Sequence, residues 1–183
     1  MYILMATVLI ILVVSAFIFN RFIKYRFMMR EASSGIDVQL KRRHDLIPNI
    51  VEAVKGYMQY ERKLLEDITN IRARLAGVVD TKEKSGLENE LSRGLKNIFA
   101  IAENYPDLKA NKSFLDLQNS LVEVEDQIQL ARRYYNGTVR NYNILAESFP
   151  SNLIARIFNF KTAGFFEIEY ATERQVPDIK FGG

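Results

Sequence analysis

The chain has 183 residues, 48% hydrophobic and 26% charged, which suits a folded domain and argues against a disordered chain. It contains no cysteine and a single histidine, so disulfides, thiolate zinc sites and cysteine nucleophiles are excluded. Four of its 25 bases, Arg21, Lys24, Arg26 and Arg30, follow the first apolar segment, which leaves 21 bases against 22 acids elsewhere. A nucleic-acid binder needs a basic face on its folded domain, and this near-neutral balance excludes nucleic acid as a partner.

The first predicted element is an apolar helix over residues 2–19. Eighteen residues give about 27 Å of helix, close to the roughly 30 Å hydrocarbon core of a bilayer. The segment has no charged side chain, and its hydroxyl groups belong to Tyr2, Thr7 and Ser15. One alternative is a cleaved signal peptide, but that would place bases before a shorter apolar stretch. Another alternative is a buried core helix. We predict a retained transmembrane helix over residues 1–20.

The four bases lie in a connector that we assign to residues 21–35. Because Lys and Arg beside a spanning helix remain on the cytoplasmic side, we expect the N-terminus outside and all later residues in the cytoplasm. Each base near an anionic leaflet is also worth about 1 kcal/mol of lipid attraction. Topology alone, without lipid specificity, is the interpretation of these bases that we favour, so they predict orientation.

Residues 36–75 carry apolar side chains at helical spacing. Two interleaved series repeat every seven residues, which is typical of one buried helical stripe. The spacing predicts a helix of about forty residues, and Pro48 inside it predicts a kink or a helix start. The two series are Leu40, Ile47, Val54, Ile68, Leu75 and Ile36, Ile50, Tyr57, Leu64, Ile71, with charged Glu61 and Arg43 at the remaining positions.

Three further helices are predicted after residue 75. A break at residues 77–85 contains Asp80-x-x-Glu83, a capping-box pattern. The helix that follows carries its apolar residues over positions 87–102 and ends before Pro106, because a residue that precedes proline disfavours helical geometry. The next helix begins after Asn111 or Ser113 and runs to about residue 145. Residues 150–152 then lead into a short helix over 153–158.

These elements predict an all-α fold, with an N-terminal transmembrane helix followed by an up-and-down bundle of three long helices and a short fourth. The second bundle helix, with about 24 residues, is shorter than the first. Residues 35–51 would therefore extend toward the bilayer as a stalk, which can be continuous with the spanning helix. Its apolar stripe needs a partner, either the C-terminal segment or another copy of the chain.

No catalytic, cofactor-binding or metal site is predicted. His44 stands beside Asp45, but adjacent residues point about 100° apart on a helix and cannot form an orienting pair. A metal site would need oxygen ligands for a hard ion, and the residue three before His44 is Lys41. Phosphate-loop and hydrolase motifs are missing from the sequence. An oxygen-ligand metal enzyme remains a third class of function.

Two charged residues in the predicted inward stripe need partners. Glu61 lies about level with residues 98 and 99, which makes Lys96 a candidate. Arg43 has no predicted partner within one chain, so it either pairs with another copy or extends along its methylenes to solvent. The candidate interaction and assembly residues are Asp37, Gln39, Lys41, Arg42, Arg43, Asp45, Pro48, Asn49, Glu61, Tyr105, Pro106, Asp107, Arg132, Arg133, Tyr134 and Asn136.

Residues 132–136 hold two arginines followed by two tyrosines and an asparagine, and arginines beside aromatic residues are also typical of an RNA surface. Arg132 follows Gln118 and Glu125 at intervals of seven, however, as the polar edge of a helix does. Further on, residues 158–170 hold five aromatic side chains, the last of them Tyr170. We expect this segment to fold back over the bundle end or the stalk; exposed, it would form a partner or membrane patch. The tail from Glu173 is expected to be mobile unless Phe181 docks.

Several of these motifs together resemble the LemA family of bacterial membrane proteins. The resemblance rests on residues 36–49 (IDVQLKRRHDLIPN), 103–111 (ENYPDLKAN), 131–136 (ARRYYN) and 149–152 (FPSN). It implies one N-terminal anchor, a cytoplasmic bundle of four helices, and no known activity or cofactor. Some members are tied to the formation of organelle-like membranes, which implies a scaffolding role.

The predicted function is a non-enzymatic, membrane-anchored scaffold that self-associates through its transmembrane and stalk helices and organises or shapes the bacterial inner membrane. The lipid bilayer and further copies of the chain are its expected partners. The alternative is an adaptor or signalling module that presents its bundle to a cytoplasmic, membrane or protease partner. The expected organisation is a transmembrane helix (1–20), a connector (21–35), the LemA-like bundle (36–160), and an aromatic segment with a tail (161–183).

Overall fold

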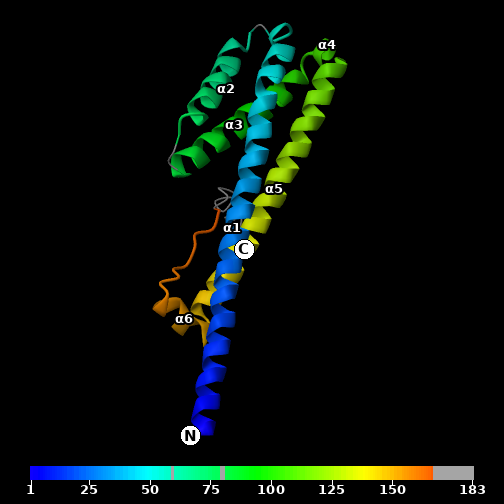
Figure 1. Ribbon diagram of the computed structural model, residues 1–183. Coiled ribbons are helices and arrows are strands. Elements are labelled where there is room, and N and C mark those ends of the chain that lie inside the picture. Colours follow the sequence, from blue (N-terminus) through cyan, green and yellow to red (C-terminus); the bar gives the residue numbers. More distant parts are fainter. Residues whose placement is uncertain (59, 79–80, 167–183) are drawn as a thin grey trace, which may run out of the picture. The chain divides into compact units, whose positions relative to one another are not determined.

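The computed structural model describes residues 1–58, 60–78 and 81–166, without the side chains of residues 81 and 82. Its described residues form helices and contain no strand, so the predicted all-α class is confirmed. The expectations for Asp80, Tyr170 and the tail from Glu173 concern residues outside these ranges. The helices, labelled in Figure 1, are α1 (Tyr2–Lys55), α2 (Arg62–Leu75), α3 (Thr81–Ala102), α4 (Pro106–Lys109), α5 (Lys112–Glu147) and α6 (Ser151–Ile157).

The described residues divide into two compact units. Unit 1 consists of Met1–Asp45 and Asn119–Phe166, and unit 2 consists of the described part of Leu46–Gln118. Helices α1 and α5 each contribute residues to both units, because each is much longer than the elements that pack on it. The two units are described in turn.

Helix α1 runs without interruption for 54 residues, from the apolar N-terminal segment to Lys55. The predicted continuity of the spanning helix with the stalk is therefore confirmed. The helix start expected at Pro48 is wrong, because Pro48 lies inside α1. Proline in a helix interior removes one backbone donor, and the remaining turns of α1 continue on both sides of it.

The predicted forty-residue helix over residues 36–75 is wrong, because the chain turns after Lys55 and α2 begins only at Arg62. The backbone amides of Tyr57 and Met58 both donate to the carbonyl of Val54, at 3.0 and 2.9 Å. The turn shifts the register, so that Met58 is buried and the predicted core residue Tyr57 is exposed. Helix α2 has buried apolar residues of its own, and Ile68 and Leu75 lie at the spacing predicted from α1. The apolar spacing therefore gave no sign of the turn.

In unit 2, α2 packs against α3, as Figure 1 shows. Ile68 of α2 is fully buried, and a Cβ atom placed on Gly94 of α3 would lie 2.8 Å from its Cγ1. Glycine thus permits the close approach of the two helices. Leu91 and Ile98 of α3, which are close to Gly94 in the sequence, are fully buried. Helix α3 confirms the predicted second bundle helix, but it begins at Thr81, so the break predicted over residues 77–85 is wrong from residue 81 onward.

The segment after α3 contains a one-turn helix that the periodicity did not predict. Pro106 opens α4, at the helix position where its missing N–H costs nothing, and Leu108 is fully buried. Helix α5 then begins at Lys112, as one of the two predicted starts requires. Asn111 caps it, since the amide of Phe114 donates to the Asn111 Oδ1 at 3.2 Å.

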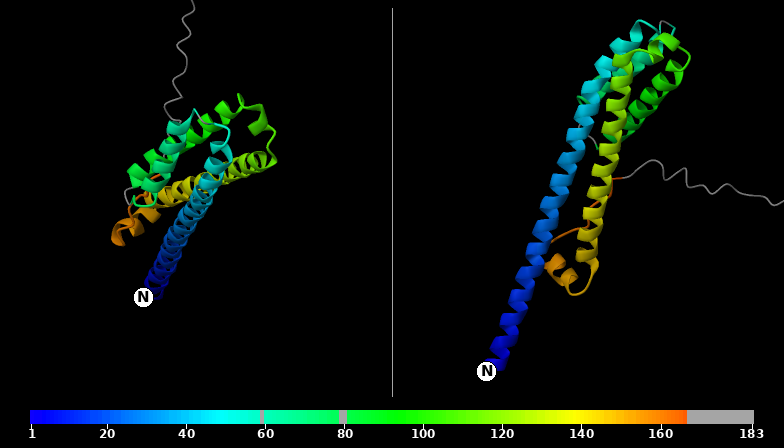
Figure 2. Two further views of the ribbon diagram at one scale, coloured as in Figure 1. Left: turned by 90° about the horizontal axis from the view of Figure 1, so that it is seen from above. Right: turned by 90° about the vertical axis from the view of Figure 1, so that its right-hand side faces the viewer.

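In unit 1, the part of α1 that follows the apolar N-terminal segment lies alongside the C-terminal part of α5, with α6 beside them (Figures 1 and 2). Helix α6 confirms the predicted short helix, with its start two residues earlier. Asn159 follows it with φ 55°, a left-handed conformation that Asn tolerates. The amide of Phe160 bonds the carbonyl of Ala155 at 2.8 Å, which completes a Schellman motif and redirects the chain toward α1.

Candidate membrane-proximal site

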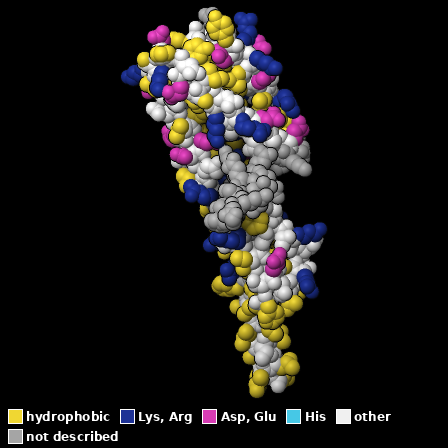
Figure 3. All heavy atoms as spheres, turned by 180° about the vertical axis from the view of Figure 1, so that it is seen from behind, with side chains coloured by type: hydrophobic (Ala, Val, Ile, Leu, Met, Phe, Trp, Pro, Cys, Tyr) yellow, Lys and Arg dark blue, Asp and Glu magenta, His cyan; other side chains and the backbone are white. Residues whose placement is uncertain are grey.

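The N-terminal segment of α1 is apolar and exposed. An 18-residue window has a mean hydropathy of 2.8, and none of it is buried. The helix is therefore long and apolar enough to cross a membrane by length and composition. Figure 3 shows this end of α1 covered with hydrophobic side chains. The interpretation as a buried core helix is wrong for the described residues, because none of this window is buried among them.

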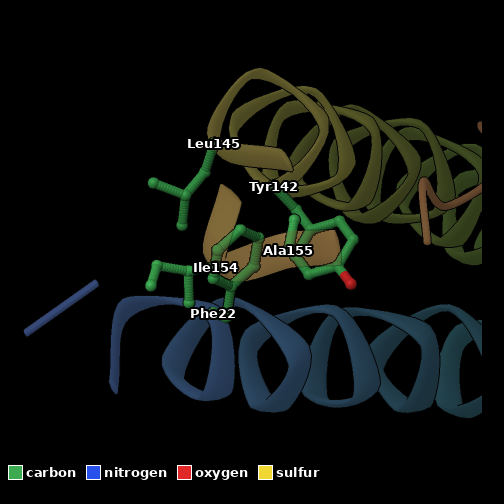
Figure 4. Close-up of a cluster of buried hydrophobic side chains, with 5 residues drawn as sticks. All are labelled: Phe22, Tyr142, Leu145, Ile154 and Ala155. Carbon is green, nitrogen blue, oxygen red and sulfur yellow. The ribbon is translucent and has the colours of Figure 1, made fainter. Parts of the chain in front are cut away.

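Directly after this segment, α1 enters a buried hydrophobic cluster. Phe22 is fully buried and meets Tyr142 of α5 edge to face, with ring centroids 5.7 Å apart. Figure 4 shows side chains from α1, α5 and α6 pointing toward one another in this cluster. Burial raises the pKa of Tyr142, and the nearby charge of Arg26 partly opposes that rise. The labelled members are Phe22, Tyr142, Leu145, Ile154 and Ala155.

Aromatic side chains after α6 cover the exposed side of this cluster. Phe160 stacks on Phe22 with centroids 4.5 Å apart and planes 7° from parallel. Phe158 meets Phe19 at 4.8 Å in an edge contact. Such ring pairs add about 0.5–1.5 kcal/mol each beyond area burial. The expected return of the C-terminal aromatic segment is confirmed for residues 158–166, which we call the C-terminal strap, although Phe165 within it is exposed.

Two asparagines of α5 hold the strap through paired hydrogen bonds. The Asn143 Nδ2 donates to the carbonyl of Ala163 at 2.9 Å, and the amide of Ala163 donates back to the Asn143 Oδ1 at 2.8 Å. Asn136 makes the same pair with Phe166, at 3.1 and 2.7 Å. A side-chain amide matches the donor and acceptor of one backbone residue, so each asparagine binds the strap as a neighbouring strand would.

The predicted Arg132–Asn136 surface is used largely within the chain. Arg132 is buried, with its guanidinium carbon 4.7 Å from the centroid of the Phe166 ring. Tyr135 donates to the carbonyl of Gly164 at 3.3 Å. Asn136 holds the strap, whereas Arg133 and Tyr134 remain exposed. An RNA surface is thus wrong for Arg132, because the ring of Phe166 occupies the face that a base would need.

The predicted basic collar lies on the first turns after the apolar segment. Arg21, Lys24, Arg26 and Arg30 are all exposed. The guanidinium carbon of Arg26 lies 5.9 Å from the Phe160 ring centroid, and that of Arg30 lies 5.5 Å from Phe27. Stacking on a ring keeps a guanidinium extended while its charge stays in water. The collar therefore surrounds α1 at the level of the aromatic cluster.

Arg43 has a partner within the chain, so both predictions for it are wrong. Its side chain is 1% exposed, and its Nη1 lies 3.0 Å from the Glu125 Oε2 of α5. Neither another copy nor solvent is needed to balance its charge. The available signal was the seam of α5, where Glu125 precedes Arg132 by seven residues. Beside this pair, Arg42 and Glu123 form an exposed ion pair at 3.4 Å.

The remaining residues of the predicted α1 motif do not converge on one point. Lys41 and Asp45 form an exposed ion pair at 3.9 Å, one helical turn apart. Pro48 and Asn49 are exposed, as is Asp37. Gln39 is half-buried. The motif thus surrounds the helix, and its buried member Arg43 is the one that joins α1 to α5.

In unit 2, Glu61 and Tyr105 are brought together. The Tyr105 hydroxyl donates to the Glu61 Oε2 at 2.8 Å. The observed partner of Glu61 is therefore Tyr105, whereas Lys96 was the predicted one. This hydrogen bond to a carboxylate raises the pKa of Tyr105, because it stabilises the protonated phenol. Asn111 donates to the Tyr57 hydroxyl at 3.2 Å. Pro106 and Asp107 are exposed on α4.

The described residues hold no group of three or more His, Asp or Glu side chains that could bind a metal ion. Most of the polar contacts described above hold parts of the chain together, as Arg43–Glu125 joins α1 to α5 and Asn143 holds the strap. What the arrangement can do chemically is to hold a basic, aromatic collar next to an exposed apolar helix.

Comparison with known proteins decides the family. Residues 32–181 match the sequence model of the LemA family. The chain belongs to the LemA family. The resemblance found in residues 36–49 and 103–111 is thereby confirmed. The apolar segment and the four collar bases precede the LemA match.

Named relatives extend this finding. Protein LemA of Metamycoplasma hominis is 33% identical over 128 residues, which cover 68% of this chain and 54% of that protein. Magnetosome protein MamQ 2 of Paramagnetospirillum magneticum is 24% identical over 175 residues, covering 81% and 64%. MamQ of Magnetospirillum gryphiswaldense is 21% identical over 174 residues with the same coverage. This LemA-family chain thus spans between half and two thirds of the length of these relatives, and none of these three names denotes an enzyme.

Proposed function

We propose that this LemA-family chain is a non-enzymatic scaffold anchored in the bacterial inner membrane by residues 2–19. The exposure of the whole apolar window carries the proposal. A helix with a mean hydropathy of 2.8 and no buried residue in that window leaves a large apolar surface without protein cover. Water makes such a surface costly, and lipid removes that cost.

The orientation that we propose follows from the collar. The four exposed bases lie on the C-terminal side of the apolar segment, where the positive-inside rule places the cytoplasm. The described residues after Asn20, in both units, would then be cytoplasmic. Protease added to intact cells should leave these residues uncut, whereas disruption of the membrane should expose them. Digestion on intact cells would contradict the orientation, and a mature N-terminus beyond residue 20 would contradict the retained anchor.

Self-association is the second part of the proposal. Arg43 and Asn136 are used inside the chain, so contacts between copies would use the exposed apolar surfaces of α1. These include the anchor itself, Phe27 of the connector, which is 62% exposed, and Val38 of the stalk, which is 59% exposed. The names of the MamQ relatives, which are magnetosome proteins, support a role in membrane organisation.

Mass photometry of the full chain in lipid nanodiscs and electron microscopy in vesicles test self-association. We expect assemblies larger than one chain. Val38→Asp should lower particle mass if the stalk forms the contact, while Val122→Asp, at 57% exposure on α5, serves as the matched control. Single chains under all conditions would overturn the scaffold and favour an adaptor that presents its bundle to another protein.

A further inference from the structure

Helix α6 is apolar on two sides. Its buried side, with Ile154 and Ala155, packs in the cluster around Phe22. On its other side, Leu153 is 50% and Ile157 is 72% exposed, and these residues share a face because they lie one turn apart. The flanking residues Phe149 and Phe158, at 81% and 53% exposure, extend this surface. We call Phe149, Leu153, Ile157 and Phe158 the α6 face.

Contacts within unit 1 fix the level of this face along α1. Phe158 meets Phe19, and both Ile18 and Phe19 pack against the cluster that α6 completes. Phe19 is the last apolar residue before Arg21, the first charged residue of the chain. The edge of the hydrocarbon core therefore lies near residues 19–21, whatever the tilt of the anchor. The α6 face is held at that edge.

Basic side chains accompany the α6 face. Arg156 on α6 and Lys161 in the strap are exposed, and both line a hollow of about 490 Å³ together with Glu147 and Asn152. Long basic side chains at a membrane interface cover apolar surface with their stems and direct their charges to lipid phosphates. The collar bases Arg21 and Arg26 stand at a similar level of α1.

We propose that α6 is an interfacial helix whose exposed face enters the bilayer surface, as a second membrane contact beside the anchor. The inference rests on the proposed anchor and adds to it. An anchor alone permits unit 1 to tilt, whereas two contacts fix the unit against the bilayer. A scaffold needs such a fixed orientation relative to the bilayer if the shape of its assembly is to determine the shape of the membrane.

A second copy of the chain is the competing occupant of the α6 face. The position of the face along α1 favours lipid. In every copy of the chain, the face lies beside the turns of α1 that reach the lipid headgroups. The bases favour lipid as well, since interfacial helices combine an apolar face with Lys and Arg. A protein partner would need acids to match Arg156 and Lys161.

Single-cysteine labelling tests the proposal cleanly, because the chain contains no native cysteine. Leu153→Cys, Leu12→Cys and Val122→Cys would each carry an environment-sensitive fluorophore in the full chain, reconstituted in vesicles with and without nitroxide-labelled lipid. Leu12 reports the anchor, and Val122 on α5 reports an exposed position. We expect the nitroxide lipid to reduce fluorescence at Leu12 and Leu153 at least twofold and to leave Val122 unchanged.

The outcomes separate the two proposals. Unquenched fluorescence at Leu12 overturns the anchor. Quenching at Leu12 with water-like, unquenched fluorescence at Leu153 overturns the interfacial helix alone. A blue-shifted but unquenched label at Leu153 shows that protein covers the face, which also overturns it. In a further arm, Ile157→Asp should reduce the quenching of a Phe149→Cys label, while Asn141→Asp on exposed α5 should not.

Discussion

The two units share the helices α1 and α5 but are stabilised differently. Unit 1 joins its segments through the hydrophobic cluster around Phe22 and through specific polar groups, namely the Arg43–Glu125 pair and the asparagines that bind the strap. In unit 2, α2 and α3 meet in a close apolar contact between Ile68 and Gly94, and polar pairs such as Glu61–Tyr105 and Asn111–Tyr57 accompany it. Specific polar contacts determine which segment packs where, whereas apolar contacts mainly supply free energy.

The largest expected effect comes from Glu125→Gln in unit 1. This change removes the carboxylate beside a guanidinium that is 1% exposed. Because Glu125 is 37% exposed, we expect a loss of about 2 kcal/mol in the free energy of unfolding, less than for a fully buried pair. Thermal or denaturant unfolding followed by circular dichroism measures it.

Arg43→Met is the matched variant. It replaces the buried charge with an apolar chain of similar length, so the cost should be about 1 kcal/mol or less. If Arg43→Met is the more damaging variant, the contact stabilises the fold by more than charge balance, and our account of unit 1 is wrong.

Asn143→Ala comes next. It removes two hydrogen bonds to Ala163, which are worth about 1–2 kcal/mol together. Hydrogen exchange at residues 161–166 should accelerate, while exchange in α2 and α3 should not change. Asn141→Ala, at an exposed position of α5, is the control. Equal exchange in both variants would show that other contacts hold the strap.

Gly94→Ala tests the apolar contact of unit 2. The new Cβ lies 2.8 Å from the Ile68 Cγ1, so overpacking exceeds the gain in helix propensity and costs about 1 kcal/mol net. Gly86→Ala on the same helix meets no atom within 4 Å and should stabilise the chain by about 0.5–1 kcal/mol. Changes of the same sign in both variants would contradict the close packing of α2 and α3.

The smallest effect concerns pH. Glu61 raises the folded-state pKa of Tyr105 above its usual value near 10. A raised pKa means that this contact stabilises the fold fully below that usual value, and that the stabilisation is lost as pH rises through the folded pKa. Tyr105→Phe should therefore remove part of the alkaline loss of stability, seen in unfolding curves at several pH values. An unchanged alkaline profile would show that the hydrogen bond does not persist in solution.

Local patterns predicted the helices where one signal decided the outcome. Apolar spacing predicted α3 and α5. Pro106 correctly predicted that α3 ends before it, and the turn at residues 150–152 predicted a short helix, which is α6. The turn after Lys55 was not predicted, because the apolar residues of α1 and α2 keep their seven-residue spacing across it. Helix α4 escaped because four residues are too few to show a period.

The candidate site divides in the same way. The collar bases and the aromatic strap were found from composition, since charge and apolar surface next to a spanning segment have a local meaning. The partners of Arg43 and Glu61 were not found, because Glu125 lies 82 residues from Arg43 and Tyr105 lies 44 from Glu61. The asparagine pairs with the strap were missed for the same reason.

The sequence by itself determined the all-α class, the apolar N-terminal segment, the basic residues that follow it and membership of the LemA family, because each depends on residues close together in the chain or on a motif read in order. Only the tertiary structure decided which charge Arg43 meets, where the strap lies, and that α6 keeps an apolar face uncovered. Pairing and exposure depend on distances between remote segments, and residue spacing along one helix does not contain those distances.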